Sequence, residues 1–354
     1  MAENTQKALV YTAPGEYGLY DVPVPTIIKP TDAIVRVTLS TICGSDVHIV
    51  AGHAPIMPPR RLGHEFCGEV VELGSAVKGF EIGDRVALSC LSYCGECYYC
   101  RKGVHIHCPD PDSDVFGALG ILDGCQTEFV RIPYAANTMY KIPAGLTEED
   151  VLLVGDILST GYFGAEQAEI EPGDTVAVIG SGPVGMCAMM AAKLWGPAKI
   201  IAVDIEQYRL DACLKQGIAD VALNPNDVNV VEKIRELTEG RGADKVIEAN
   251  GAEATMLMAM DAVRTAGHIC TVGVFIKPME FPMQYLWFKN LKISMGHVPC
   301  NRVPELIKLI EAGKIDTKFM YTHKAPLNDI VKGYDIFGNK KEECIKWLVT
   351  PYEK

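Results

Sequence analysis

The second half of the chain alternates between short apolar runs and helical segments, and this alternation constrains the fold more than any other feature. Six runs are expected to form strands, at residues 175–180, 199–204, 220–224, 245–250, 268–273 and 291–296. Helical segments fill the gaps between the first five runs, at residues 184–195, 207–216, 229–240 and 252–267. The last gap, VFIKPMEFPMQYLWFKN, is broken by proline and need not form one regular helix. The pattern predicts a parallel sheet with helices on both faces, and six strands match a doubly wound dinucleotide-binding fold.

A glycine loop follows the first of these strands. GSGPVG places Gly180, Gly182 and Gly185 between this strand and the next helix, where glycine permits a tight turn, approach of a pyrophosphate and close helix–strand packing. Asp204 ends the second strand, 19 residues beyond Gly185. A carboxylate there accepts a hydrogen bond from a ribose 2′-hydroxyl and repels a 2′-phosphate, although it can also cap a helix. Loop and acid together predict a nucleotide site that prefers NAD over NADP. We assign to the same site Pro183, Val184 and Arg209.

Residues 1–156 are predicted to form a β-rich domain. Strand-like runs occur at residues 32–39, 66–73, 83–90 and 127–134, and no long amphipathic helix is evident among them. Residues 157–298 then form the dinucleotide-binding domain. Residues 299–354 begin with a helical segment at 301–314, and we expect them to return to the β-rich domain. A chain of 354 residues suits about two such domains.

A cluster of cysteines lies in a loop of the β-rich region, at about residues 90–110. Cys94, Cys97, Cys100 and Cys108 have the spacing C-x2-C-x2-C-x7-C, and Cys90 stands outside it as an expected core thiol. The N-terminal MAENTQKALVYT lacks the apolar stretch of a secretory signal, so we expect a cytoplasmic, reducing location. In such a compartment clustered cysteines favour metal binding over disulfides, which remain the alternative. Four thiolates would form a closed tetrahedral zinc site with no position for a substrate.

Composition excludes several classes of function. A net charge of −12 argues against a nucleic-acid partner, and the cysteine spacing is too compact for paired zinc knuckles. No apolar run approaches the length of a membrane span. A hydrolytic zinc enzyme would need H-E-x-x-H, whereas GHEFCGE lacks the second histidine.

A second set of potential metal ligands is spread over more than a hundred residues. Cys43, His64 and Asp156 offer a thiolate, an imidazole and a carboxylate, and three protein ligands leave one zinc position open. Their spacing alone is equally compatible with a core thiol, a buried histidine and a helix N-cap.

The order of motifs resembles that of one enzyme family. CGSDVH, GHEFCGEVVELG, the four-cysteine lobe, GDILSTGYFGAE and GSGPVG occur as they do in zinc-dependent medium-chain alcohol dehydrogenases, over essentially the whole chain. The resemblance implies an α/β protein with a GroES-like β-rich catalytic domain, a Rossmann domain with a doubly wound parallel six-stranded sheet, and a homodimeric or homotetrameric assembly.

The resemblance makes Cys43, His64 and Asp156 the catalytic zinc ligands and the four-cysteine lobe a structural zinc site, hence two zinc ions per chain. Aspartate at the third ligand position resembles bacterial secondary-alcohol dehydrogenases and glutathione-independent formaldehyde dehydrogenases. Other family members have cysteine there.

Further roles follow from the same resemblance. Ser45 and His48 match a proton relay, and Asp46 matches the residue that orients the zinc-bound histidine. Glu65 matches a carboxylate that exchanges with solvent or substrate at the metal. Thr160 and Gly273 are expected beside the nicotinamide, Lys346 at the cofactor phosphates, or else on the solvated surface, and Leu119 and His297 at the substrate pocket.

The resulting expectation is reversible hydride transfer between a secondary alcohol and NAD, giving a ketone or aldehyde. Enzyme alternatives are an aldehyde dismutase that retains its NAD, or a polyol or amino-alcohol dehydrogenase. A non-catalytic NAD(H)-binding protein and a zinc-free quinone reductase would be expected to lack Cys43, His64 and Asp156, which are present.

Overall fold

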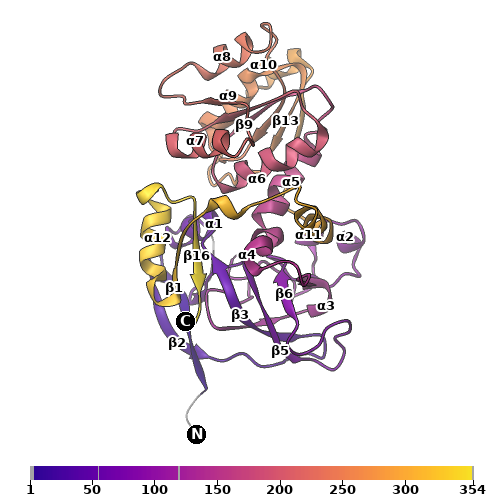
Figure 1. Ribbon diagram of the computed structural model, residues 1–354, viewed down its shortest axis with the longest axis vertical. Coiled ribbons are helices and arrows are strands. Elements are labelled where there is room, and N and C mark those ends of the chain that lie inside the picture. The colour runs from indigo at the N-terminus through magenta and orange to yellow at the C-terminus, as the bar shows by residue number, and fades with distance from the viewer. Residues whose placement is uncertain (1–3, 55, 119, 353–354) are drawn as a thin grey trace. The chain divides into compact units, whose positions relative to one another are not determined.

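The structure is a computed structural model that describes residues 4–54, 56–118 and 120–352. The chain forms two compact units (Figure 1). The first unit comprises Met1–Ser159 and Pro299–Lys354, and the second unit comprises Thr160–Val298. No helix within the described ranges is long and apolar enough to cross a membrane.

The second unit contains the predicted parallel sheet. Its six strands have the order β11-β10-β9-β12-β13-β14, which is the doubly wound order of dinucleotide-binding folds. In chain order the strands are β9 (Thr175–Ile179), β10 (Lys199–Val203), β11 (Val221–Leu223), β12 (Ala243–Glu248), β13 (Val263–Thr271) and β14 (Lys292–Met295). The connecting helices are α6 (Pro183–Ala192), α7 (Gln207–Lys215), α8 (Val230–Glu236) and α9 (Glu253–Ala262). The prediction of the fold class is therefore confirmed.

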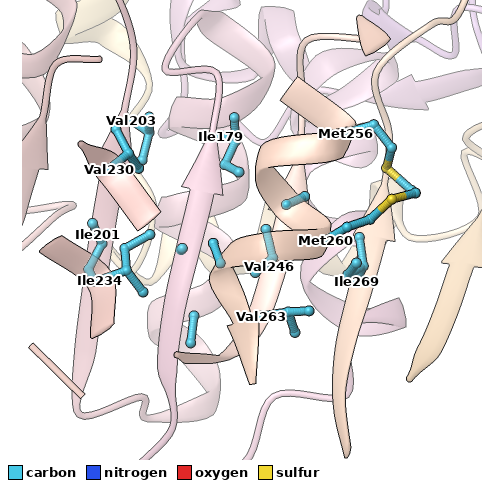
Figure 2. Close-up of a cluster of buried hydrophobic side chains, with 14 of the residues drawn as sticks. Ile179, Ile201, Val203, Val230, Ile234, Val246, Met256, Met260, Val263 and Ile269 are labelled. Atoms are coloured by element: carbon cyan, nitrogen blue, oxygen red, sulfur yellow. The ribbon is translucent and has the colours of Figure 1, made fainter. Parts of the chain in front are cut away.

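An apolar core joins this sheet to its helices. Figure 2 shows strand residues such as Ile201 and Val246 facing Ile234 of α8 and Met260 of α9. These four side chains are at most 1% exposed, so the β-branched pattern of the strands is explained by burial.

One predicted boundary in the second unit is wrong. The helix expected at 252–267 ends at Ala262, and strand β13 begins at Val263. Val263 pairs with Ala243 of β12, and after a break in the register the pairing resumes at His268, opposite Lys245. The proline-broken gap forms only the short helices α10 (Met283–Leu286) and η4 (Trp287–Lys289), as expected.

The first unit is built on two sheets that are antiparallel except for one parallel strand pair near the end of the chain. One sheet has the order β15-β16-β3-β5-β6-β8, with β7 also paired to β3, and a smaller sheet has the order β2-β1-β4. The larger sheet contains β3 (Ala33–Thr41), β5 (Phe66–Leu73), β6 (Arg85–Leu88), β7 (Phe129–Ile132), β8 (Met139–Lys141), β15 (Tyr321–Pro326) and β16 (Lys346–Thr350). The smaller sheet contains β1 (Thr5–Ala13), β2 (Glu16–Pro23) and β4 (Arg60–Arg61). The four strands predicted here are confirmed as β3, β5, β6 and β7.

The end of the chain completes the larger sheet. Leu348 and Val349 of β16 pair with Thr41 and Ser40 of β3, which is visible in Figure 1 as a yellow strand beside an indigo one. Helices α11 (Val303–Glu311) and α12 (Ile330–Gly338) belong to the same segment, and each buries an apolar face. The other helices of this unit are the short α1 (Gly44–Val50), α2 (Tyr98–Arg101), α3 (Ala135–Thr138) and α4 (Glu148–Val151), and the start of α5 (Ile157–Gln167).

Candidate metal centres and nucleotide site

The structure brings Cys43, His64 and Asp156 together in the first unit. Cys43 lies between β3 and α1, His64 lies just before β5, and Asp156 precedes α5. His64 Nε2 is 3.2 Å from Asp156 Oδ2, and Cys43 Sγ is 3.6 Å from the same oxygen. Cys43 and His64 are buried, while the side chain of Asp156 is 13% exposed. Residues distant in sequence therefore present three ligand atoms at one point.

The spacing of these atoms fits a zinc ion. Tetrahedral zinc with Zn–S near 2.3 Å and Zn–N or Zn–O near 2.05 Å separates its ligand atoms by roughly 3.3–3.6 Å. Burial raises the pKa of the Cys43 thiol, and so do the nearby Glu65 and Asp156 carboxylates. A cation would offset this concentration of negative charge and stabilise the thiolate.

Asp46 contacts the second ring nitrogen of His64, and Gln126 hydrogen-bonds to Asp46. Asp46 Oδ1 is 3.3 Å from His64 Nδ1, and Asp46 Oδ2 accepts hydrogen bonds from the Cys43 amide at 3.0 Å and Gln126 Nε2 at 3.3 Å. Tyr334 in turn donates to Gln126 Oε1 at 2.7 Å. Burial lowers the pKa of His64. Asp46, Cys43 and Asp156 together raise it by more than burial lowers it, so the pKa lies well above its usual value. Gln126 and Tyr334 belong to no motif, and no local pattern marks them as neighbours of Asp46.

Ser45 lies beside the ligand atoms, whereas His48 lies at the other end of α1. Ser45 Oγ is 3.2 Å from His64 Nε2 and 3.3 Å from Cys43 Sγ. His48 is exposed, and its Nδ1 is 3.4 Å from Nδ1 of His53. The Ser45 hydroxyl is thus within hydrogen-bonding distance of the ligand atoms, whereas His48 is at the surface.

Lys346 occupies a different place from either of those expected. Its side chain is fully buried in the first unit, where its ammonium pairs with Glu65 Oε2 and donates to the Ile42 carbonyl at 3.0 Å. It is therefore not solvated, and because its ammonium is committed within the first unit we do not assign it to the cofactor phosphates. Burial raises the pKa of Glu65 to about 7 although Lys346 acts to lower it. Glu65 Oε1 has no hydrogen-bond partner in the described part of the chain.

A Lys346→Met variant is expected to lower the free energy of unfolding by about 3–5 kcal/mol, because it leaves the Glu65 carboxylate buried without its partner. Urea unfolding followed by circular dichroism would measure the change. A Lys346→Met/Glu65→Gln variant should recover part of the loss, since no buried charge then remains. Equal stability of wild type and Lys346→Met would show that the ion pair contributes nothing.

The four cysteines of the lobe also converge. Cys94 and Cys100 have sulfur atoms 4.0 Å apart, about twice a disulfide bond of ~2.05 Å and close to the edge of ~3.8 Å for a zinc–thiolate tetrahedron. The amides of Glu96 and Cys100 donate to the sulfurs of Cys94 and Cys97 at 3.5 and 3.4 Å. Such N–H···S contacts stabilise thiolates, so this set fits a closed zinc site.

Cys90, which stands outside this set, is buried as predicted, and its thiol contacts that of another cysteine. Its Sγ is 3.5 Å from Cys300 Sγ, which donates to the Gly155 carbonyl at 3.1 Å. No sequence pattern predicts this contact between distant residues.

The glycine loop of the second unit has the predicted backbone. Gly180 has a φ of 96°, which favours glycine, and a Cβ on Gly185 would lie 1.8 Å from the Gly180 carbonyl oxygen. Gly182 is the N-cap of α6, and Pro183 and Val184 form its first turn. The start of this helix is therefore open to a phosphate group.

Asp204 lies against this loop. Its Oδ2 accepts from the Ser181 amide at 2.7 Å, and its Oδ1 accepts from the Glu206 amide at 2.9 Å. Nη1 of Arg209 is 3.7 Å from Asp204 Oδ2 and is the atom that a Cβ on Gly182 would approach most closely. The structure thus groups Asp204 and Arg209 with the loop.

The remaining candidates are the residues expected beside the nicotinamide and the substrate. Thr160 is half-buried at the start of the second unit, on α5. Gly273 follows β13, and a Cβ there would lie 2.2 Å from the Gly251 amide nitrogen. His297 is exposed, and Leu119 lies outside the described residues.

Comparison with known proteins gives consistent matches over the whole chain. Residues 29–144 match the family profile of the alcohol dehydrogenase GroES-like domain, and residues 183–312 match that of zinc-binding dehydrogenases. An alcohol dehydrogenase of Cupriavidus necator is 37% identical, over 98% of this chain and 99% of the relative. Zinc dependent alcohol dehydrogenase 2 from Streptococcus pneumonia superposes with a TM-score of 0.92 at 38% identity, over 99% of both chains. A putative zinc-binding dehydrogenase from Sinorhizobium meliloti bound to NADP superposes with a TM-score of 0.87 at 27% identity, over 98% of this chain and 99% of that one.

Proposed function

This chain belongs to the zinc-dependent medium-chain alcohol dehydrogenase family, and we propose that it transfers a hydride reversibly between a secondary alcohol and NAD. The observation that carries the proposal is the approach of Cys43, His64 and Asp156 at distances that suit a zinc ion with one open position. Aspartate at the third ligand position resembles secondary-alcohol dehydrogenases and supports that class of substrate. The four-cysteine lobe would hold a second, structural zinc ion.

The residues around the trio of Cys43, His64 and Asp156 have separate proposed roles. A zinc ion held there would supply a Lewis acid that lowers the pKa of the substrate hydroxyl, and NAD would accept the hydride. Asp46, whose Oδ1 is 3.3 Å from His64 Nδ1, is proposed to orient the ring so that Nε2 faces the other two ligand atoms. Glu65 Oε1, buried and without a partner in the described residues, is the atom that we propose exchanges with solvent or substrate.

Ser45 is proposed to take the proton that leaves the substrate hydroxyl. Its Oγ lies 3.2 Å from His64 Nε2, so a hydroxyl held beside the ligand atoms would be within its reach. Exposed His48, on the same helix, is proposed as the group at the surface that exchanges protons with solvent.

A Ser45→Ala variant is expected to lower kcat by about a hundredfold, the lower end of the range for general acid–base groups. His48→Ala should be slowed less and be partly rescued by small buffer bases, because its role is at the solvent end. Steady-state kinetics at several buffer concentrations would check both, with Ser45→Thr as the control that keeps the hydroxyl. Full activity of Ser45→Ala would remove Ser45 from the proton route.

The cofactor site is proposed to lie at the glycine loop and to prefer NAD. Asp204 beside the loop supports this preference because its charge opposes a 2′-phosphate, although Arg209 partly offsets that charge. Thr160 and Gly273 are proposed to contact the nicotinamide ring. Exposed apolar residues near edge strand β14 support a homodimer or homotetramer; they include Trp287, Phe288 and Met295.

A substrate screen tests the proposed function. Secondary alcohols, polyols and aldehydes would each be offered with NAD and with NADP while the absorbance of the reduced cofactor is followed. We expect the highest kcat/KM for a secondary alcohol with NAD, at least about tenfold above NADP, which corresponds to 1.4 kcal/mol. A clear preference for NADP would overturn the cofactor assignment, and no turnover of any alcohol by zinc-loaded protein would overturn the proposal.

A further inference from the structure

The C-terminal end of α1 is a Schellman motif with a histidine at each of its two paired positions. The Gly52 amide donates to the Ile49 carbonyl at 2.9 Å, and the His53 amide donates to the His48 carbonyl at 2.9 Å. Gly52 has a φ of 77°, the left-handed conformation that the motif requires. The motif commonly brings the side chains of these two positions into contact. In this chain the two side chains are both imidazoles.

The backbone that carries the two rings is fixed by its neighbours. The Gly15 amide donates to the Val50 carbonyl at 2.7 Å. A Cβ at Gly52 would lie 2.7 Å from Cβ of Pro14, so this position accepts only glycine. The packed turn therefore fixes the backbone positions of both histidines relative to each other.

The two ring nitrogens have the separation of two metal ligands. His48 Nδ1 and His53 Nδ1 are 3.4 Å apart, and the ring planes are inclined by 43°. A tetrahedral zinc ion with Zn–N near 2.05 Å separates two nitrogen ligands by about 3.3 Å. Both residues are exposed, so water could complete the coordination. Burial and the neighbouring His53 lower the pKa of His48, which favours the neutral ring that a metal requires.

We propose that His48 and His53 form a bidentate site for a divalent transition-metal ion such as Zn²⁺, separate from the trio and from the four-cysteine lobe. Imidazole nitrogen is a preferred ligand of zinc, nickel and copper. The site lies at the C-terminal end of a helix, where backbone carbonyl groups favour a cation. Two protein ligands make it weaker than either of the other two centres.

The site would also have a functional consequence, which rests on the proposed function. A metal ion on His48 Nδ1 would occupy the residue that passes the proton to solvent. Excess zinc would then inhibit the enzyme reversibly. Binding of the ion itself does not depend on that role.

Isothermal titration of the zinc-loaded enzyme with ZnCl₂ tests the site directly. We expect wild type to bind one further zinc ion, and His53→Ala to bind it at least about tenfold more weakly, since even outer-shell partners of a metal contribute about 10- to 100-fold. His323→Ala, which removes an imidazole elsewhere in the first unit, is the matched control and should bind as wild type does. Equal affinity in wild type and His53→Ala, or no further zinc ion bound by wild type, would overturn the proposal.

Activity measurements separate this inference from the proposed function. His53 is not part of the proposed reaction, so His53→Ala should keep the basal kcat while losing at least about tenfold of the sensitivity to added zinc. Inhibition of His53→Ala at the same zinc concentration as wild type would contradict the inference. If zinc binding depends on His53 but leaves wild-type activity unchanged, the metal site stands, and only the relay role of His48 is overturned.

Discussion

A Cys43→Ala variant is expected to lose alcohol oxidation by about a thousandfold or more, while its fold is retained. Cys43 is proposed to supply one of three protein ligands, and its Sγ lies 3.6 Å from Asp156 Oδ2. Without the thiolate, His64 and Asp156 alone would hold zinc weakly. Loss of a Lewis acid that contributes several kcal/mol to the transition state corresponds to at least about three powers of ten in rate.

The measurement is kcat/KM with the best alcohol from the substrate screen, together with the zinc content per chain. Cys67→Ala is the matched control, because Cys67 is an equally buried thiol on β5 that belongs to neither ligand group. Cys43→Ala should lose one zinc ion and its activity, and Cys67→Ala should lose neither. Activity in Cys43→Ala within tenfold of wild type would remove this cysteine from the reaction.

A Cys100→Ser variant is expected to lower stability severely and to spare the chemistry. The lobe has little apolar core of its own, since Tyr98 and Tyr99 are 71% and 44% exposed. We therefore expect its structure to depend on a metal cross-link, and structural zinc contributes about 10–16 kcal/mol of apparent binding free energy in isolated zinc-finger peptides. In a larger unit, only part of this free energy would appear as lost global stability.

Thermal unfolding and limited proteolysis would measure the effect. We expect a clearly lower unfolding temperature and rapid cleavage between residues 94 and 108, with zinc retained at the trio. Below the unfolding temperature, kcat should stay within about tenfold of wild type, because no group of the lobe takes part in the proposed reaction. A variant that keeps its stability would show that the lobe needs no metal.

The sequence pattern predicted the fold correctly where the backbone conformation of an element requires a particular type of residue. The glycine loop is predictable because Gly180 needs a positive φ and Gly185 has no room for a Cβ. The boundary at Val263 was not predictable, because helix α9 ends at Ala262 and strand β13 begins at the next residue without a glycine or proline between them. Periodicity cannot locate such a junction, which is set by pairing with β12.

The candidate ligands were recognisable by residue type and motif order, but their surroundings were not. Lys346 meets Glu65 across 281 residues of sequence because β16 pairs with β3, and no local signal encodes that register. Gln126 reaches Asp46 in the same way, through the packing of distant segments. The pairing of His48 with His53 is local, and its signal was present: a glycine directly before the second histidine.

We propose that Cys43, His64 and Asp156 carry the reaction, while the more conspicuous four-cysteine lobe has only a structural role. Zinc content and alcohol-dependent NADH formation, measured side by side in wild type, Cys43→Ala and Cys100→Ser, test it most directly. We expect two tightly bound zinc ions per wild-type chain, one for each ligand group, apart from the weaker histidine site, and the loss of one of these two ions in either variant. NADH formation should be lost in Cys43→Ala alone. Loss of NADH formation in folded Cys100→Ser, with activity retained in Cys43→Ala, would contradict the proposal.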